Sequence, residues 1–161
     1  MRGGTISFIL SQDIYTRSLF DGFWFPDLPA ELTKIPALII LNTDNSTGPG
    51  EHWCAAYISE SKHCEFFDPL GAPPENNLLN YSFMPQLSKY SNTIEHNIIP
   101  VQHITATTCG PHCLFFCFYR ARGISLESIL KRFYSSDTHS NDNSVSQFIH
   151  NLNKFILPLS K

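Results

Sequence analysis

Residues 52–68, HWCAAYISESKHCEFFD, decide the fold that this chain is expected to adopt. Two apolar runs, 53–58 and 64–67, flank a short polar link, and this pattern is typical of a β-hairpin. His52 begins the first strand, and Asp68 follows the end of the second. Because antiparallel pairing brings those two ends together, we expect the imidazole and the carboxylate to meet.

Outside this hairpin, residues 37–41, ALIIL, form a continuous apolar run that indicates a buried central strand. A further strand is expected over 96–101, and residues 20–25 are expected to pack as an irregular aromatic segment. Helices are expected over 12–21, 73–90, 108–119 and 125–133. A last helix follows from the helical spacing of Val145, Phe148, Ile149, Leu152 and Phe155. The expected class is α+β, a small mixed sheet flanked by helices.

The length of 161 residues favours a single domain, 1–161, that can bury a core without disulfides or metals. The first four residues are expected to be flexible. No apolar run approaches a membrane-spanning length, so we expect a soluble, intracellular protein. A formal net charge of −3 gives no overall attraction to nucleic acid. The densest basic cluster consists of Arg120, Arg122, Lys131 and Arg132.

Five cysteines are an odd number and too few for a disulfide framework, so reduced thiols are expected. Cys109 begins the predicted helix 108–119, where the helix dipole and free N–H groups stabilise a thiolate. Gly110 permits close approach of a substrate backbone, and the Cys109 amide can face a developing oxyanion. The alternative is a stripe of buried core thiols, and we adopt that interpretation for Cys113 and Cys117.

Three further polar residues complete a set that supports nucleophilic catalysis. His52 can serve as general base, Asp68 can fix its tautomer, and the Gln102 amide can supply a second oxyanion donor. Each one alone is weak evidence: a histidine at a strand edge is commonly structural, and Asp-Pro is a common turn. Their occurrence together with Cys109 is what favours a cysteine hydrolase.

The segments Gly50-Glu-His-Trp53, Phe66-Phe-Asp-Pro-Leu-Gly71 and Gln102-x6-Cys109-Gly110 resemble the adenovirus proteinase (adenain) family. More distantly they resemble the Ulp-type proteases that act on SUMO. The resemblance runs from about residue 12 to the end of the chain. It implies a triad of Cys109, His52 and Asp68, an oxyanion hole formed by Gln102 and the Cys109 amide, and a narrow cleft shaped by Trp53 and Gly110.

The same resemblance implies a function. Family members include viral and virus-like enzymes that mature capsid proteins, so we expect a monomeric endopeptidase that cleaves capsid precursors near glycine. Such an enzyme would work in the host nucleus or cytoplasm and be packaged in the virion. The alternative with the same mechanism is a deubiquitinase or deSUMOylase acting on host conjugates. Hydrolysis of ubiquitin or SUMO reporters, compared with capsid precursors, separates the two.

Two departures from the adenovirus pattern concern the carboxylate and activation. Asp68 stands where the adenovirus enzyme has glutamate, and aspartate is familiar in the Ulp branch. Residues 91–101 contain no cysteine, so a disulfide-linked peptide activator is not expected. No cofactor is expected to be required, and activation by DNA is left open.

Residues 1–5, MRGGT, resemble the (Met/Ile/Leu)-x-Gly-Gly-x cleavage consensus of that family. This predicts autoprocessing after Gly4. The alternative is a flexible chain start without any processing.

Two interpretations from other classes remain. One is a zinc module built from His63, Cys64, His103, Cys109, His112 and Cys113. The spacings lack a paired C-x2-C set, so no metal is expected. The other is a non-catalytic binding module, against which the retained cysteine, histidine, aspartate and glutamine argue. Zinc content and peptide hydrolysis are the discriminating measurements.

Overall fold

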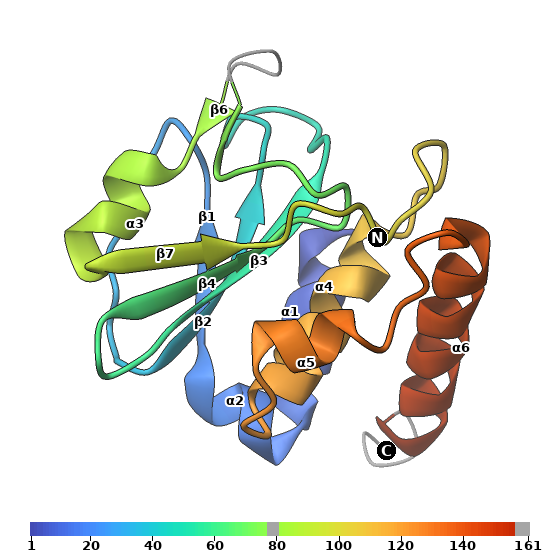
Figure 1. Ribbon diagram of the computed structural model, residues 1–161. Helices are drawn as coiled ribbons and strands as arrows, with labels where there is room; N and C mark the ends of the chain where they lie inside the picture. The colour runs from blue at the N-terminus through green and yellow to red at the C-terminus, as the bar shows by residue number, and fades with distance from the viewer. Residues whose placement is uncertain (77–80, 157–161) are drawn as a thin grey trace.

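The computed structural model describes residues 1–76 and 81–156 (Figure 1). Two helices and two strands come first: α1 (Gly3–Gln12), α2 (Ile14–Leu19), β1 (Phe20–Trp24) and β2 (Ala37–Asn42). The middle of the chain forms β3 (Trp53–Ile58), β4 (His63–Phe67), β5 (Glu75–Asn76), β6 (Tyr81–Ser82), α3 (Met84–Tyr90) and β7 (Thr93–His96). The last elements are α4 (Cys109–Arg120), α5 (Leu126–Leu130) and α6 (Thr138–Ile156). The predicted α+β class is confirmed.

The main sheet has five strands in the order β1-β2-β3-β4-β7. Strands β2, β3 and β4 are antiparallel, while β1 runs parallel to β2 and β7 runs parallel to β4. Ala55 pairs with Phe67, so the start of β3 and Asp68, which follows β4, lie at the same end of the hairpin. The hairpin predicted from residues 52–68 is therefore confirmed, and it brings His52 and Asp68 to one edge of the sheet.

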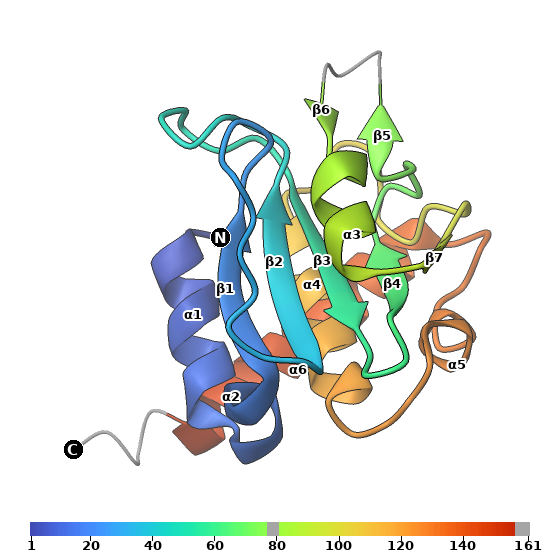
Figure 2. The same ribbon diagram turned by 90° about the vertical axis from the view of Figure 1, so that its left-hand side faces the viewer.

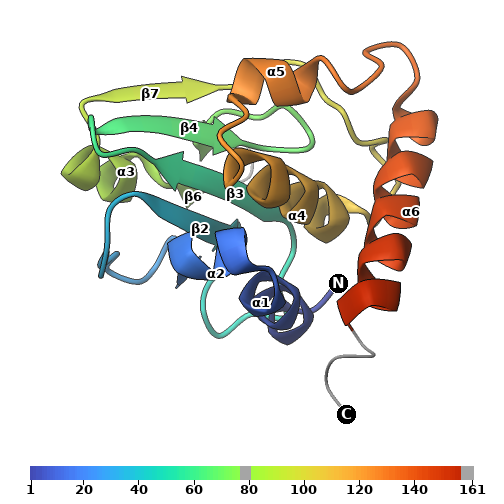
Figure 3. The ribbon, with the colours of Figure 1, turned by 90° about the horizontal axis from the view of Figure 1, so that it is seen from below.

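Strand β2 is buried along its whole length, as its continuous apolar run predicts. Alternate side chains enter two different cores: Leu38 and Ile40 face one, while Ile39 and Leu41 face the other. Figure 2 shows α3 in front of the sheet and α4 behind it. Helices α1 and α6 lie beside α4 on that second side (Figure 3). The sheet is thus covered on both faces.

Helix α4 begins beside the start of β3, which determines where Cys109 lies. Cys113, one turn further on, is fully buried, and its thiol donates to the backbone oxygen of Trp53 over 3.2 Å. Thr108 is the N-cap residue, but its side chain does not cap the helix. The Thr108 hydroxyl donates to Asp142 instead.

Several predicted elements need correction. Residues 20–24 are strand β1, because parallel pairing with β2 orders them, with a register shift near Gly22. The helix expected over 73–90 begins only at Met84, since Pro85 lacks an N–H and fits a first helical turn. Residues 77–80, with Leu78 and Leu79 of that prediction, lie outside the described residues.

Boundaries shift in the later elements as well. The strand expected over 96–101 is wrong: the strand in this region, β7, covers Thr93–His96, and only His96 of the expected range belongs to it. Helix α5 ends at Leu130, before the expected 133, and Ser125 caps it by accepting from the Ser128 N–H. The last helix is confirmed as α6.

The chain start is ordered, contrary to the expected flexibility of residues 1–4. Helix α1 begins at Gly3, and Ile6, Ile9 and Leu10 on its inner face are 0 to 3 % exposed. Burial of these three side chains outweighs the poor helix propensity of the two glycines. Among the described residues, no helix has both the length and the apolar character that a membrane crossing requires.

Candidate active site

His52 and Asp68 meet at the open end of the β3–β4 hairpin. The His52 Nε2 and Asp68 Oδ1 atoms are 2.7 Å apart, and the two side chains are 13 % and 1 % exposed. Asp68 Oδ1 also accepts from the Leu70 backbone N–H over 2.7 Å. The carboxylate is therefore held by two donors in a site that is largely closed to water.

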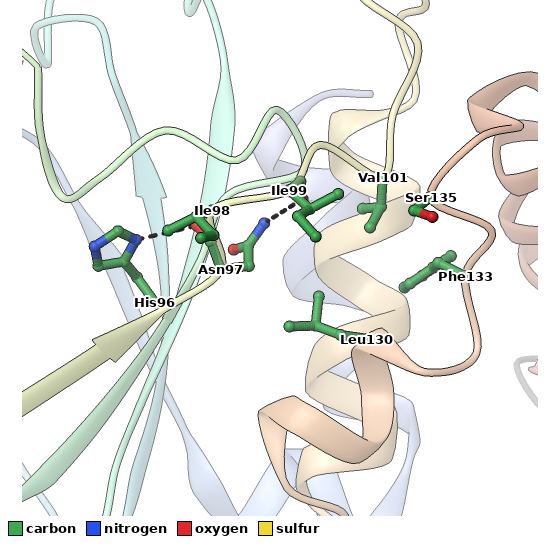
Figure 4. Close-up of a pocket in the computed structure, with 8 residues that line it drawn as sticks. All are labelled: His96, Asn97, Ile98, Ile99, Val101, Leu130, Phe133 and Ser135. Atoms are coloured by element: carbon green, nitrogen blue, oxygen red, sulfur yellow. Dashed lines mark hydrogen bonds between the residues drawn. The ribbon is translucent and has the colours of Figure 1, made fainter.

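The backbone of Asp68 is held by Asn97, a residue that the sequence analysis did not single out. The Asp68 N–H donates to Asn97 Oδ1 over 3.0 Å, and Asn97 Nδ2 donates back to the Asp68 carbonyl over 2.7 Å. Asn97 Nδ2 also donates to the Ile99 carbonyl, as Figure 4 shows. A lone asparagine after a strand gave no local signal of this role.

Gly71 explains the glycine of the Asp-Pro-Leu-Gly segment. Its φ is +72°, and a Cβ there would lie 2.8 Å from the backbone nitrogen of Pro100. Only glycine fits this conformation and this close approach. The turn from Asp68 to Gly71 can therefore pack directly on the segment that leads to Gln102.

Cys109 is hydrogen-bonded to His52 at the start of α4. Burial alone would lower the pKa of His52, but the hydrogen bonds to Asp68 and Cys109 outweigh it and raise the pKa to about 9. Burial alone would raise the pKa of the Cys109 thiol. The hydrogen bond to His52 and those from the Trp53 and Gly110 backbone lower it below its ordinary value.

These opposite shifts favour proton transfer from the thiol to the imidazole. Since Nε2 of His52 is bonded to Asp68, Nδ1 is the ring nitrogen left for Cys109. A thiolate beside an imidazolium is the reactive form of a cysteine nucleophile. The arrangement can therefore support nucleophilic attack by Cys109 and acid–base chemistry by His52.

Gln102 lies in the same cleft and is 4 % exposed. Its backbone N–H donates to the Pro69 carbonyl over 3.0 Å, which ties it to the Asp68 turn. Its side-chain Nε2 donates to the Ala106 carbonyl over 2.8 Å, while Oε1 has no partner among the described residues. A side-chain amide carries two N–H groups, so one remains for a ligand in the cleft.

The cleft has a volume of about 310 Å³. Its walls are formed by Met1, Gly50, Glu51, His52, Trp53, Leu70, Gln102, Ile104, Ala106, Thr107 and Cys109. A second cavity of about 200 Å³ lies beyond Asn97 and has a mainly apolar lining (Figure 4). That cavity contains neither Cys109 nor His52, so the reactive groups belong to the first cleft.

Met1 lines the cleft beside two of the predicted site residues. Trp53 Nε1 donates to the Met1 carbonyl over 3.0 Å, and a Cβ on Gly110 would lie 2.9 Å from the Met1 Cβ. The close approach at Gly110 is therefore to the chain's own first residue and not to open cleft: Gly110 is buried and is not among the residues that line the cleft, which corrects its predicted place there. Gly4 lies exposed in the first turn of α1, where the backbone is helical.

The alternative zinc set does not assemble. Within 1–76 and 81–156, grouped metal-ligand atoms occur at His52, Cys54 and Asp68 and at His63, Glu65 and Glu95. The first group includes the His–Asp pair itself, and in the second Glu65 accepts from Arg120 Nε over 2.5 Å. His112 is instead fully buried, with its Nε2 3.0 Å from Asp142 Oδ1.

Two members of the basic cluster are neutralised within the fold. Arg120 pairs with Glu65, and Arg122 pairs with Asp13 over 2.5 Å. The cluster therefore offers less free positive charge than the sequence suggests.

Comparisons with known proteins match part of the chain by sequence and most of it by fold. No protein-family model matches the chain. A stretch of 93 residues is 32 % identical to a cysteine protease of African swine fever virus from a tick isolate of Malawi, covering 53 % of this chain. It is 31 % identical to a SUMO-1 cysteine protease of a South African tick isolate of the same virus. Each match spans only 34 % of the relative's length.

A solved structure supports the fold over nearly the whole chain. ChlaDub1 from Chlamydia trachomatis is 15 % identical and matches with a TM-score of 0.54. The match covers 98 % of this chain and 78 % of the ChlaDub1 chain. At this level of identity the likeness concerns the fold alone.

Proposed function

We propose that this chain is an endopeptidase of the Ulp/adenain-like family of cysteine proteases, with Cys109 as nucleophile and His52 as general base. The observation that carries the proposal is the chain of contacts from Asp68 through His52 to Cys109. It combines a 2.7 Å bond to a buried carboxylate with opposite pKa shifts of the imidazole and the thiol.

The proposed reaction begins with attack of the Cys109 thiolate on the carbonyl carbon of the scissile peptide bond. The oxyanion that forms accepts from the Cys109 backbone N–H and from the free N–H of Gln102. The His52 imidazolium gives its proton to the departing amine, which leaves an acyl-enzyme. His52 then takes a proton from water, and the resulting hydroxide releases the acid and regenerates the thiolate.

Asp68 acts in this scheme through His52. Its bond to Nε2 keeps Nδ1 directed at Cys109, and its negative charge stabilises the imidazolium. The two anchors from Asn97 hold the aspartate backbone while the histidine changes charge. The scheme requires no metal or cofactor.

For the substrate, we favour a polypeptide cut near glycine during capsid maturation, with the enzyme packaged in the virion. A cleft of about 310 Å³ accepts an extended segment, and a glycine there would pass beside Trp53 and Cys109. The viral origin of the matching relatives supports this choice. The SUMO-1 protease name of one relative supports a second candidate, hydrolysis of ubiquitin-like conjugates.

Labelling with an electrophilic Gly-Gly peptide, followed by mapping of the modified residue, tests the chemistry. We expect modification at Cys109 in the wild type and in Cys113→Ser, and none in Cys109→Ala. Modification of another cysteine would refute the assignment. Hydrolysis of SUMO or ubiquitin reporters and of glycine-containing capsid precursors, each with and without DNA, then separates the substrates and tests an activator.

Autoprocessing after Gly4 remains a separate proposal. The helical first turn of α1 would have to unwind before it could enter the cleft as an extended strand. Intact masses of the wild type and of Cys109→Ala test this, because identical chain starts in both would contradict it.

A further inference from the structure

Helix α6 contacts the loop that connects Gln102 with Cys109 (Figure 1). We propose that Asn141 and Asp142, in the first turns of α6, are positioning residues that hold the oxyanion donor and the nucleophile in register. This inference rests on the roles proposed above for Gln102 and Cys109. Neither residue of the Asn141–Asp142 pair touches the cleft, so each would act through the backbone of the loop.

Asp142 bonds to the loop at both of its ends. Its Oδ2 accepts from the backbone N–H of His103, directly after Gln102, over 3.1 Å. Its Oδ1 accepts from the hydroxyl of Thr108, directly before Cys109, over 2.5 Å. A single carboxylate therefore fixes the distance between the residues that flank the two oxyanion donors.

Asn141 supplies the matching contact on the other side of Gln102. Its Nδ2 donates to the Val101 carbonyl over 3.0 Å and to the Tyr134 carbonyl over 2.8 Å, and its Oδ1 accepts from the Tyr134 N–H over 2.8 Å. With His103 held by Asp142, the backbone of Gln102 is anchored before and after its own position.

Burial makes these contacts difficult to replace by water. Asn141 and Asp142 are 2 % and 7 % exposed. The third partner of Asp142 is His112, which is 0 % exposed and bonds to Oδ1 over 3.0 Å. Burial lowers the pKa of His112 against the opposing hydrogen bond to Asp142, so a neutral imidazole donates from Nε2. Both carboxylate oxygens of Asp142 therefore accept hydrogen bonds.

Asp142→Asn is the informative substitution because it keeps the shape but removes one acceptor. If the amide oxygen stays with Thr108 and His112, its NH2 group faces the His103 N–H, donor against donor. The loop then loses its anchor beside Gln102. We expect kcat on a peptide substrate to fall about 100-fold, with KM changed less than about threefold, since misplacement by about 1 Å has effects of this size.

Two matched controls accompany that variant. Asp137→Asn makes the same change directly before α6, where the carboxylate accepts from the Ser140 hydroxyl and backbone N–H, and kcat should stay within about twofold. Thr108→Val deletes one contact of Asp142 and should lower kcat about tenfold, whereas Thr108→Ser keeps the hydroxyl and should restore it. If Asp142→Asn fails to fold, comparison of Thr108→Val with Thr108→Ser still tests the inference.

A second readout is the pH profile of Cys109 alkylation by iodoacetamide, which needs no peptide hydrolysis. In Asp142→Asn and Thr108→Val we expect the thiolate limb to move to higher pH, because the start of α4 is less well held. The inference would be overturned if Asp142→Asn lost no more kcat than Asp137→Asn. It would also be overturned if Asp142→Asn kept the wild-type alkylation profile and its kcat stayed within about threefold of the wild type. If the wild type hydrolysed no substrate, that result would count against the proposed function. The alkylation profile would still test the positioning role of Asp142.

Discussion

The protein contains two histidine–aspartate pairs of similar geometry and opposite electrostatics. His52 lies 2.7 Å from Asp68, and His112 lies 3.0 Å from Asp142. The pKa of His52 is raised to about 9, whereas the pKa of His112 is lowered. In both cases burial lowers the pKa and the aspartate raises it, so the aspartate alone does not explain the difference.

What differs is the second ring nitrogen. His52 also bonds to Cys109 and opens into the cleft, while His112 Nδ1 is buried with no partner among the described residues. A histidine–carboxylate pair is therefore not a catalytic site by itself. The first pair can exchange a proton with a thiol, and the second can only hold a neutral imidazole in place. Substitutions in the two pairs should separate these roles.

The largest effect is expected from removing the histidine of the first pair or the thiol that it contacts. Cys109→Ala and His52→Ala should each lower kcat by on the order of 10⁶-fold, since members of such a unit act together. His112→Gln should stay within about tenfold of the wild type per folded molecule. Steady-state hydrolysis, normalised to the folded fraction by circular dichroism, provides the measurement. Retained hydrolysis in Cys109→Ala would refute the mechanism.

The two aspartates offer the next contrast. Asp68→Asn should lower kcat about 10⁴-fold, because the amide favours the wrong imidazole tautomer and cannot stabilise the imidazolium. That loss should exceed the loss in Asp142→Asn, where the aspartate acts only through backbone position. Parallel kinetics of the two variants test the order, and a smaller loss in Asp68→Asn would reverse the assignment of the two pairs.

The pH dependence of the first pair follows from its shifted pKa values. In the wild type, kcat/KM should rise as Cys109 deprotonates below its ordinary pKa of 9.0 and fall as His52 loses its proton near pH 9. In Asp68→Asn the imidazolium is less stable, so the thiolate limb of Cys109 alkylation should move to higher pH. Iodoacetamide rates across pH measure this, and coincident profiles of the two proteins would contradict it.

The two histidines should make opposite contributions to the pH dependence of folding stability. Because the folded pKa of His112 lies below its ordinary value of 6.5, the unfolded state binds the proton first as pH falls. Stability should therefore decrease below about pH 6.5, and the decrease should be smaller in His112→Gln. The contribution of His52 is present below that pH and is lost as pH rises through about 9. Urea unfolding of both proteins above and below pH 6.5 tests the difference.

Local sequence signals predicted the hairpin and the site residues at its end. The apolar runs on both sides of residues 59–62 and the flanking polar residues His52 and Asp68 are properties of one short segment, which pairing only brings together. The order of Gln102, Cys109 and Gly110 added a family resemblance. The structure places Gln102 and Cys109 in one cleft with His52, whereas Gly110 is buried beside that cleft.

Contacts between distant segments were not predictable in this way. Helix α1 starts with two glycines and no side-chain cap, and only burial of Ile6 and its neighbours against the sheet and α4 orders it. Strand β1 depends on a parallel partner reached through a long connection. Asn97 and Asp142 are ordinary polar residues until the fold places backbone groups around them.

The smallest effects on activity are expected from the four cysteines other than Cys109. Burial raises the pKa of each of them: Cys64 to about 12, and Cys54, Cys113 and Cys117 further still. They therefore remain protonated and do not act as nucleophiles. Serine at any of these positions should leave hydrolysis detectable in the folded protein.

The loss of folding stability in these serine variants should depend on whether the new hydroxyl has a hydrogen-bond partner. Cys113→Ser keeps a donor for the Trp53 carbonyl, which its thiol already reaches over 3.2 Å, and should cost less than about 1 kcal/mol. Cys117→Ser buries a hydroxyl in the apolar core between α4 and the sheet, and should cost about 1–3 kcal/mol. Urea unfolding gives the ranking. If Cys113→Ser instead abolished hydrolysis while folding normally, the nucleophile would have to be sought one turn further along α4.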